Sequence, residues 1–452
     1  MNLTVEKRRF YKELFAIVLP ITIQNFLNSA VNFADVFMIG FAGQKALAAV
    51  SLANQYQFLL QGLFFGMASG VTILCSQYWG KQDMKSIQAV MGIAWKITMA
   101  VTAVIAFLAF FFPKNLMLIY TNDMELVKTG AVYLRIAGIS YFIAGISSVY
   151  ESTLKSIERA HISTLIASMA LILNVILNAI FIFGLCGFPK MGVLGAALAT
   201  LIARIAELVF CLIDMRRGKV FQVDLRIVLG RHPLLFRDFL NYSLPALAND
   251  ILWTLAFSSY SVILGHLNSD MVAANAITTN VRELCTILCF GISGGGSVLL
   301  GKRIGERKME EAEKTASWLC QSAFAVGVIT GGIILLIRPL IPHLFDLTPR
   351  AESYMMGMLL ISSYYIIGQD MNTLLIAGIF RAGGNTRFGL ICDTVTMWVV
   401  SVPLGVISAF VLHLPPMTVY FILCLDEFWK VPVVIRYYKS KKWLKNITRE
   451  YE

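Results

Sequence analysis

Charged residues are scarce in this chain. Asp, Glu, Lys and Arg make up 14% of its 452 residues, whereas hydrophobic residues make up 57%. A soluble domain of this length does not need so much apolar sequence to form its core. The scarcity of charge therefore excludes a soluble protein and indicates an integral membrane protein.

Closely spaced cysteine pairs are also missing. The eight cysteines lie within or at the ends of apolar stretches, and none forms a Cys-x-x-Cys pair. This pattern excludes a disulfide framework and indicates that the cysteines serve as small buried hydrophobic side chains.

Two catalytic signatures, His-Glu-x-x-His and Gly-x-Gly-Asp, do not occur in the chain. A membrane-embedded enzyme needs a catalytic set of this kind at membrane depth. An enzyme is therefore the least favoured class, and we expect a protein that is not an enzyme and uses no cofactor.

Long apolar runs are abundant. Each is close to the ~20 residues that an α-helix, rising 1.5 Å per residue, needs to cross ~30 Å of hydrocarbon. The first run is too long for the core of a signal peptide. We predict an all-α polytopic membrane protein with twelve transmembrane helices. The runs are 14–40, 47–74, 87–112, 130–150, 162–183, 193–213, 239–264, 273–299, 315–337, 354–378, 388–412 and 416–438.

The positive charges predict an orientation. With the N-terminus inside, 27 of the 38 Lys and Arg residues fall on the inner side, counting Arg436 at the inner end of the last run, six on the outer side and five deeper within the runs. Cytoplasmic loops hold such an excess. We predict a multi-pass protein of the cytoplasmic (inner) membrane, surrounded by lipid, with both termini in the cytoplasm. Because the basic residues are dispersed over seven inner segments, the net charge of +11 does not indicate a nucleic-acid partner.

The sequence contains an internal repeat. A shift of 225 residues aligns 19–84 with 244–309 without a gap, and a shift of 222 aligns Ile157–Ala160 with Ile379–Ala382. The first alignment pairs Pro20 with Pro245, and a proline inside a helix removes a backbone hydrogen bond and permits a hinge. It also pairs four glycines: Gly40 with Gly265, Gly66 with Gly291, Gly70 with Gly295 and Gly80 with Gly305.

Six predicted helices separate the starts of the two copies, so both copies point the same way across the membrane. We therefore predict two six-helix bundles related by a parallel pseudo-two-fold axis. The N-terminal lobe covers 1–213 and the C-terminal lobe 238–452, which ends in a basic cytoplasmic tail. Between them, 214–237 is a basic, amphipathic cytoplasmic connector that we expect to lie on the inner leaflet.

Four polar residues of the first half are predicted to lie at a similar depth, in the outer half of the membrane: Asp35, Asn174, Asn178 and Thr200. An ionisable group within a membrane helix is expensive, by ~2.5–3.5 kcal/mol at the centre. A carboxylate with amide and hydroxyl oxygens suits Na+, and a carboxylate alone among apolar groups suits H+. The competing interpretation is that Asn and Thr bond across helices as packing contacts.

Other ionisable residues have structural explanations. Arg204 and Glu207 are three residues apart, and Asp426 and Lys430 are four apart, so each pair can form within one helical turn. Arg135, Glu151 and Asp393 lie near the ends of predicted helices and can reach headgroups.

In the second half, four charged residues lie near the midpoints of predicted helices: Asp250, Arg282, Glu283 and Asp370. Arg282 can neutralise nearby carboxylates in a structural cluster, or these charges can contact a substrate. Aromatic residues would suit a planar organic cation if they line a cavity, and otherwise belong to the core or face lipid. These are Trp253, Tyr260, Tyr365 and Phe290.

This order of features resembles the multidrug and toxic compound extrusion (MATE) family of cation-coupled exporters. The likeness covers nearly the whole chain and includes Ser76–Gly80 after the second run and Arg381–Thr386 after the tenth. It implies that Asp35 is the acidic residue of the N-lobe, with Asn174, Asn178 and Thr200 as cation ligands. Asp370 then corresponds to the C-lobe acidic residue of sodium-coupled norfloxacin exporters.

That branch also carries a glutamate on the seventh helix, where this chain has Trp253, with Asp250 nearly one turn away. The resemblance implies a secondary antiporter that exports amphipathic or cationic compounds in exchange for Na+ or H+ by alternating access. Its substrate cavity would include Asp250, Trp253, Tyr260, Phe290, Tyr365 and Asp370.

Two other carriers compete with this interpretation. A lipid-linked oligosaccharide flippase of the same superfamily needs a larger, more cationic cavity, whereas the candidate residues here are mostly apolar and acidic. A major-facilitator carrier is disfavoured because its Gly-x-x-x-Asp-[Arg/Lys]-x-Gly loop is absent from Ser76–Lys85. Since one chain supplies both lobes, we expect a monomer whose partners are a small organic substrate and a monovalent cation.

Overall fold

The computed structural model describes residues 3–41, 43–218, 221–345 and 347–450, and the regular elements among them are all helices. The helices pack into two compact units. The amino unit contains Ile23–Leu240 and Glu450, and the carboxyl unit contains the residues up to Thr22 together with Asn241–Arg449. Helix α1, Leu3–Gly40, therefore contributes its first half to the carboxyl unit and its second half to the amino unit.

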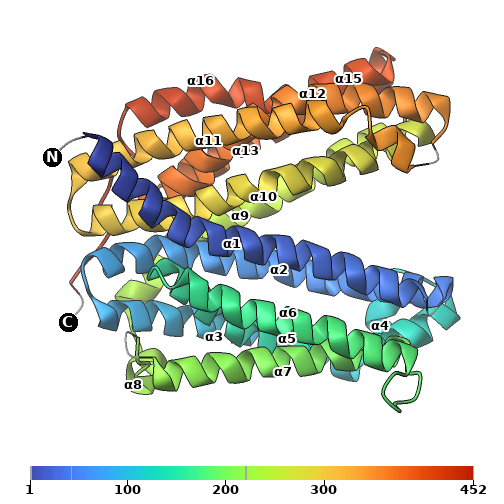
Figure 1. Ribbon diagram of the computed structural model, residues 1–452, viewed down its shortest axis with the longest axis horizontal. Helices are drawn as coiled ribbons and strands as arrows, with labels where there is room; N and C mark the ends of the chain where they lie inside the picture. Colours follow the sequence, from blue (N-terminus) through green and yellow to red (C-terminus); the bar gives the residue numbers. More distant parts are fainter. Residues whose placement is uncertain (1–2, 42, 219–220, 346, 451–452) are drawn as a thin grey trace. The chain divides into compact units, whose positions relative to one another are not determined.

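The amino unit is a bundle in which α5 packs against α2, α3 and α7, and α6 packs against α7 (Figure 1). Its core includes Leu60, Leu134 and Ala197, none more than 2% exposed. Besides the second half of α1, its helices are α2 (Gln44–Gly80), α3 (Met84–Phe111), α4 (Pro113–Leu118), α5 (Met124–Ser156), α6 (Ala160–Phe183), α7 (Val193–Arg217) and α8 (Leu225–Leu229).

In the carboxyl unit, α12 packs against α10, α11 and α16. The unit comprises the first half of α1 and the helices α9 (Pro233–Gly265, from Asn241 on), α10 (Ser269–Gly305), α11 (Met309–Ile337), η1 (Ile341–Leu344), α12 (Pro349–Thr373), α13 (Thr386–Asp393), α14 (Val402–Val406), α15 (Pro416–Leu423) and α16 (Asp426–Lys439). Three π-helical segments, η2 (Leu374–Phe380), η3 (Thr394–Ser401) and η4 (Ile407–Val411), continue α12, α13 and α14.

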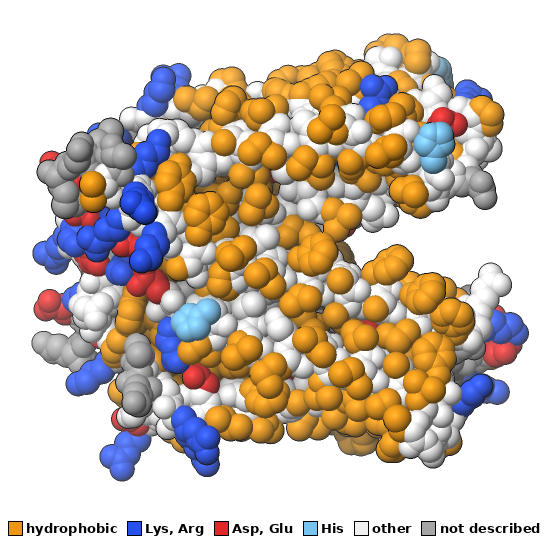
Figure 2. All heavy atoms as spheres, in the orientation of Figure 1, with side chains coloured by type: hydrophobic (Ala, Val, Ile, Leu, Met, Phe, Trp, Pro, Cys, Tyr) orange, Lys and Arg blue, Asp and Glu red, His pale blue; other side chains and the backbone are white. Residues whose placement is uncertain are grey.

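The surface pattern within each unit fits a protein surrounded by lipid. Figure 2 shows hydrophobic side chains over the flanks of the helices, whereas blue and red charged side chains gather at helix ends. Large hydrophobic side chains that are more than 60% exposed include Phe33 and Phe65 in the amino unit and Leu336 and Val399 in the carboxyl unit. Exposed apolar area of this kind is unfavourable in water, whereas contact with the hydrocarbon of a membrane removes that cost.

Ten of the predicted membrane helices are long and apolar enough to cross a bilayer, counted over the described residues. The exceptions are the runs 354–378 and 416–438. The first corresponds mainly to α12, which carries the polar residues Gln369, Asp370 and Asn372. The second is divided into α15 and α16, with eight and fourteen residues, because the helix is interrupted at Cys424 and Leu425.

Both predicted hinge prolines lie inside long helices. Pro20 is within α1 and Pro245 within α9, and each helix continues past its proline. In α1 the division between the two units falls between Thr22 and Ile23, two residues beyond Pro20. The hinge role stays a prediction.

The predicted connector folds partly against the amino unit. Phe221 and Val228 are buried, whereas Leu225 and Leu229 are more than 60% exposed. The side chain of Gln88 on α3 donates to the carbonyl of Gln222, which ties the segment to the bundle. Residues 219–220 of the connector lie outside the described residues. Its position on the inner leaflet and the predicted lobe boundaries stay predictions.

A glycine permits the close approach of α3 to α8. A β-carbon at Gly92 would overlap the backbone carbonyl of Val228, whereas one at Gly62 on α2 would meet nothing within 4 Å. We expect Gly92→Ala to lower the melting temperature of the purified protein, because a backbone atom cannot move aside as a flexible side chain can. Gly62→Ala should leave it unchanged or raise it, since alanine favours helix over glycine. Equal melting temperatures for the two variants would contradict this packing.

Candidate functional site

The four predicted cation ligands lie together in a cavity of the amino unit. The cavity has a volume of about 230 Å³, and its wall includes Asp35 from α1, Asn174 and Asn178 from α6, and Thr200 from α7. Residues that are 139 to 165 positions from Asp35 in sequence are thus brought to one place by the packing of three helices. Their role as cation ligands and their role as packing contacts across helices both stay predictions.

A continuous chain of hydrogen bonds joins the four side chains. Asn178 Nδ2 donates to Asp35 Oδ1 at 2.7 Å and to Asn174 Oδ1 at 3.2 Å. Asn174 Nδ2 donates to Thr200 Oγ1 at 3.4 Å, and that hydroxyl donates to the carbonyl of Ala196 at 3.0 Å. The amide oxygen of Asn178 is buried and accepts no hydrogen bond from any described residue. A cation near Asp35 would supply the positive charge that the amide donor supplies in this arrangement.

The cavity wall contains further polar residues that the sequence analysis did not single out. Asn54, Gln57 and Gln61 on α2 and Tyr133 on α5 line it. The three α2 residues are spaced by three and four positions, which places them on one face of a helix. That spacing within an apolar run was a signal that could have identified them.

Arg204 and Glu207 also line the cavity, and they form the predicted pair within one turn of α7 at 2.6 Å. The cavity wall thus carries two acidic side chains, Asp35 and Glu207, and one basic side chain, Arg204. The excess of acid favours cations over anions in this cavity.

Glu151 and Asp393 do not reach headgroups as predicted, because both are no more than 6% exposed. Gln24 Nε2 on α1 donates to Glu151 Oε2 at 3.1 Å, and Ser163 on α6 donates to the same oxygen at 3.5 Å. Asp393 pairs with Lys430 at 3.0 Å. The positions of these residues in the sequence did not reveal that neighbouring helices cover them.

In the carboxyl unit, Asp250 is paired with Arg381. Arg381 Nη2 lies 2.6 Å from Asp250 Oδ1, and Nη1 lies 3.3 Å from Oδ2, so both carboxylate oxygens accept from one guanidinium. The predicted structural neutralisation of Asp250 is present, but its partner is Arg381 rather than Arg282. The guanidinium of Arg282 lies instead 5.3 Å from the ring centres of both Phe257 and Tyr365.

The other predicted substrate-cavity residues have different surroundings. Tyr260 and Tyr365 belong to the buried core of the carboxyl unit, with Trp253 packed against it, and Phe290 is 43% exposed. Asp370 is fully buried, and neither of its carboxylate oxygens accepts a hydrogen bond from a described residue. The assignment of these residues to a substrate cavity stays a prediction.

One sequence, Gly291–Gly295, formally matches the Gly-x-Ser-x-Gly pattern of serine hydrolases. Its serine, Ser293, lies in the middle of α10 and donates to the carbonyl of Thr373 at 3.3 Å. The hydrolase pattern requires a sharp turn between a strand and a helix. A serine within a continuous helix does not have that geometry, so this match indicates no catalytic site.

A metal centre of the usual kind is not formed by the residues described. No group of three or more His, Cys, Asp or Glu side chains among them could hold a metal ion. The predicted Na+ site has a different composition, with one carboxylate and three neutral side chains.

The all-helical fold, with its long apolar helices, defines a polytopic membrane protein. The MatE family model matches residues 20–180 and 245–407, so the chain belongs to the MATE family. The two matched segments begin at Pro20 and Pro245, the pair aligned by the internal repeat. Members of this family are membrane transporters, which fits the expectation of a protein that is not an enzyme.

Related proteins match over almost their full length. The chain is 24% identical over 437 residues to the uncharacterized transporter YisQ of Bacillus subtilis, covering 95% of this chain and 94% of the relative. It is 24% identical to the probable multidrug resistance protein NorM of Thermotoga maritima, covering 97% and 95%. An outward-facing multidrug resistance MATE transporter of the MOP superfamily has a similar fold, with a TM-score of 0.85, 19% identity and 95% coverage of each chain. The predicted all-α membrane fold is confirmed.

We expect Asp250→Ala to destabilise the protein. The Arg381 side chain is only 8% exposed and would lose its carboxylate partner. Breaking a fully buried pair costs ~3–5 kcal/mol, and because Asp250 is 31% exposed we expect roughly 1–3 kcal/mol here. The measurement is the melting temperature of the purified protein, with Glu283→Ala as the control because Glu283 is exposed on α10. An unchanged melting temperature for Asp250→Ala would show that the ion pair does not stabilise the unit.

Proposed function

We propose that this transporter exports amphipathic or cationic organic compounds in exchange for Na+ or H+ moving inward. The observation that carries the proposal is the cavity of the amino unit, where Asp35 meets Asn174, Asn178 and Thr200. The probable multidrug resistance protein to which the chain is similar supports the same substrate class. In this proposal the chain has no cofactor besides the coupling ion.

The binding of a cation to Asp35 decides which conformation the amino unit adopts. Without a bound cation its carboxylate accepts from Asn178, which also donates to Asn174. A cation that binds Asp35 replaces the amide donor, so Asn178 must turn its side chain and present its amide oxygen. This rearrangement involves α1 and α6 and links the charge of Asp35 to the packing of the two helices.

Coupling requires only that the cation and the organic substrate prefer different conformations. A cation entering from the outside would neutralise Asp35, bend α1 near Pro20 and favour release of the substrate. After the cation leaves to the cytoplasm, the cavity would again accept a cationic substrate. The linkage is reciprocal, because each ligand weakens the binding of the other by the same factor.

The organic substrate would contact acidic and aromatic side chains. From the carboxyl unit we propose Asp370, Trp253, Tyr260, Tyr365 and Phe290, with Asp250 contributing through its pair with Arg381. Aromatic faces and carboxylates together suit a planar organic cation. An oligosaccharide flippase would instead need an excess of basic residues.

The orientation follows from the distribution of Lys and Arg. We propose that the protein is a monomer in the cytoplasmic membrane with both termini inside, since 27 of 38 basic residues would then face the cytoplasm or its leaflet. The basic, partly buried connector would contact anionic lipid.

Everted membrane vesicles test the direction and the ion. In such vesicles, export appears as accumulation of a fluorescent organic cation in the lumen. We expect accumulation when the lumen is loaded with Na+ or made acidic relative to the outside, and the comparison of the two gradients identifies the ion. Accumulation with neither gradient above that of vesicles lacking the protein would contradict antiport.

We expect Asp35→Asn to abolish ion-driven efflux while the protein still folds and inserts. The amide has the shape of the carboxylate but cannot take up a positive ion. The control is Asp123→Asn, the same substitution at an exposed residue of the same unit that caps α5, because asparagine caps helices as well as aspartate does. Normal efflux from Asp35→Asn would rule out this assignment, as would an equal loss in the control.

Thr200→Val separates the two candidate ions. The substitution preserves shape and removes only the hydroxyl that accepts from Asn174. Na+ needs several oxygen ligands, whereas a proton needs only the carboxylate. We expect efflux driven by a Na+ gradient to fall at least several-fold and efflux driven by a pH gradient to persist. Equal efflux with both gradients would exclude Thr200 as an ion ligand.

A further inference from the structure

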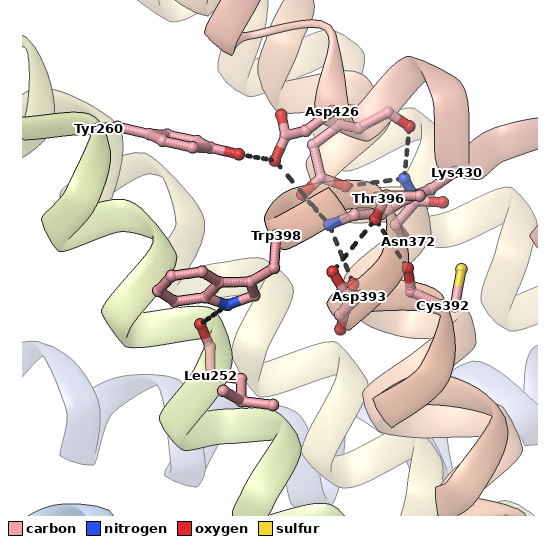
Figure 3. A network of polar contacts seen from close by, with 10 residues as sticks. Leu252, Tyr260, Asn372, Cys392, Asp393, Thr396, Trp398, Asp426 and Lys430 are labelled. Carbon is pink, nitrogen blue, oxygen red and sulfur yellow. Dashed lines mark hydrogen bonds and ion pairs between the residues drawn. The ribbon is translucent and has the colours of Figure 1, made fainter. Parts of the chain in front are cut away.

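A second group of buried charges lies in the carboxyl unit, where the last predicted membrane helix is interrupted. The Lys430 ammonium lies 2.9 Å from Glu427 Oε1, 3.0 Å from Asp393 Oδ1 and 4.0 Å from Asp426 Oδ2 (Figure 3). Each of these four side chains is at most 6% exposed. Three carboxyl groups thus surround a single ammonium group in the interior of the unit.

Two neutral side chains complete the cluster. The Tyr260 hydroxyl on α9 donates to Asp426 Oδ2 at 3.3 Å, as Figure 3 shows, and Asn372 Nδ2 on α12 donates to Glu427 Oε2 at 2.8 Å. Asp426 Oδ1 and Asn372 Oδ1 are both buried and accept no hydrogen bond from the residues described. A buried acceptor without a hydrogen bond costs free energy. The cluster would therefore be stabilised by at least one further proton or positive charge.

The charges around Asp426 do not balance. Among the described residues, Arg282 on α10 is a second cation that interacts electrostatically with Asp426, besides Lys430. The other titratable groups that face it are neutral hydroxyls and a thiol: Tyr260 on α9, Tyr365 on α12 and Cys424 beside α16. Three carboxylates against one ammonium and one guanidinium leave one negative charge, and Asp370, which interacts with Glu427, adds another.

An uncompensated buried charge of this kind is strongly unfavourable. We propose that Asp426 is a proton-binding site of the carboxyl unit, with Lys430 as its fixed counter-ion. Asp393 and Glu427 each have a direct contact with the ammonium, whereas Asp426 is the farthest from it. A proton on Oδ1 leaves Oδ2 to accept from Tyr260.

The internal repeat gives independent support to this position. The shift of 225 residues aligns Asp35 with Tyr260, which contacts Asp426. The shift of 222 aligns Arg204 with Asp426, and the helices α7 and α16 end at Arg217 and Lys439, which are also 222 residues apart. The helix that corresponds to α16 is therefore α7, which also carries a buried carboxyl group, that of Glu207.

The interruption of the last helix contributes to the site. α7 is continuous, whereas its counterpart is divided into α15 and α16, and Asp426 and Glu427 occupy the first turn of α16. Unpaired amide groups at a helix start stabilise nearby negative charge, which helps the unit to hold the carboxylates of this cluster, and transporters place ion sites at such interruptions. The inference concerns proton binding alone, so it stands or falls separately from the role of Asp35.

Infrared spectroscopy of the purified protein in lipid nanodiscs tests the proposal. A protonated carboxyl group has a C=O stretching band that a carboxylate lacks. We expect the wild type at neutral pH to show such a band, Asp426→Asn to lack it, and Asp35→Asn to keep it. If folded Asp426→Asn has the same protonated-carboxyl bands as the wild type, Asp426 does not hold the proton and the proposal is wrong.

Two tyrosine variants keep the test decisive if Asp426→Asn does not fold. Tyr260→Phe removes the hydroxyl that donates to Asp426 and should shift the band. Tyr365→Phe is the matched control, because its hydroxyl is buried without a hydrogen-bond partner in the described structure and its loss should shift the band much less. If neither variant moves any carboxyl band, the proposal is overturned.

Stability provides a second readout. A protonated Asp426 resembles asparagine in charge and shape, so Asp426→Asn should retain the melting temperature of the wild type to within a few degrees. Asp393→Asn instead removes a direct partner of the buried ammonium and should lower it clearly. An equal decrease in both variants would show that Asp426 is an ionised partner of Lys430, and would contradict proton binding.

Discussion

The structure depends on how ionisable side chains are accommodated away from water. A charge within a membrane helix costs ~2.5–3.5 kcal/mol unless a partner compensates for it. The amino unit accommodates Asp35 with one amide donor and a cavity, and the carboxyl unit surrounds Lys430 with carboxyl groups. Elsewhere the cost is met by ion pairs such as Asp250 with Arg381. The polar positions therefore mark where the helices must keep their packing, and the apolar flanks between them are free to face lipid.

The two units place their carboxyl groups within the membrane region on different helices and beside different partners. The repeat places a carboxylate in the amino unit where the carboxyl unit has a tyrosine, Tyr260, and the latter draws its acidic residues from the interrupted last helix. The sites differ in one physical respect. Asp35 accepts a hydrogen bond from the amide of Asn178 and lines a cavity. Asp426 lies beside a tethered ammonium and is fully buried. Similar folds of the two halves thus do not imply equal access for ions.

Sequence reasoning predicted the helical class, most of the membrane helices and the meeting of Asp35 with Asn174, Asn178 and Thr200, because hydrophobic run length and depth along a helix can be read directly. It did not predict the break at Cys424 and Leu425, because neither residue is a glycine or a proline and the apolar run continues beyond Asp426 and Glu427. It also missed the partner of Asp250, because Arg381 is 131 residues away and the rotation of a helix about its axis is set by packing. The pair of Arg204 with Glu207 was predicted because the two residues are three positions apart on one helix, so their contact does not depend on how helices pack.

Helix α1 belongs to both units, and its first half is firmly held. Glu13 pairs with Arg303 at 3.1 Å, Glu6 with Lys314 at 3.4 Å, and the ring of Phe10 lies 5.1 Å from that of Trp318. Asp35 lies fifteen residues beyond Pro20, which is ~22 Å along a helix rising 1.5 Å per residue. If Pro20 is the hinge that we predict, the helix is a lever that is fixed at its first half and bends at the proline. A tilt of ten degrees at that hinge would carry Asp35 sideways by ~4 Å, more than the length of the hydrogen bond that holds it.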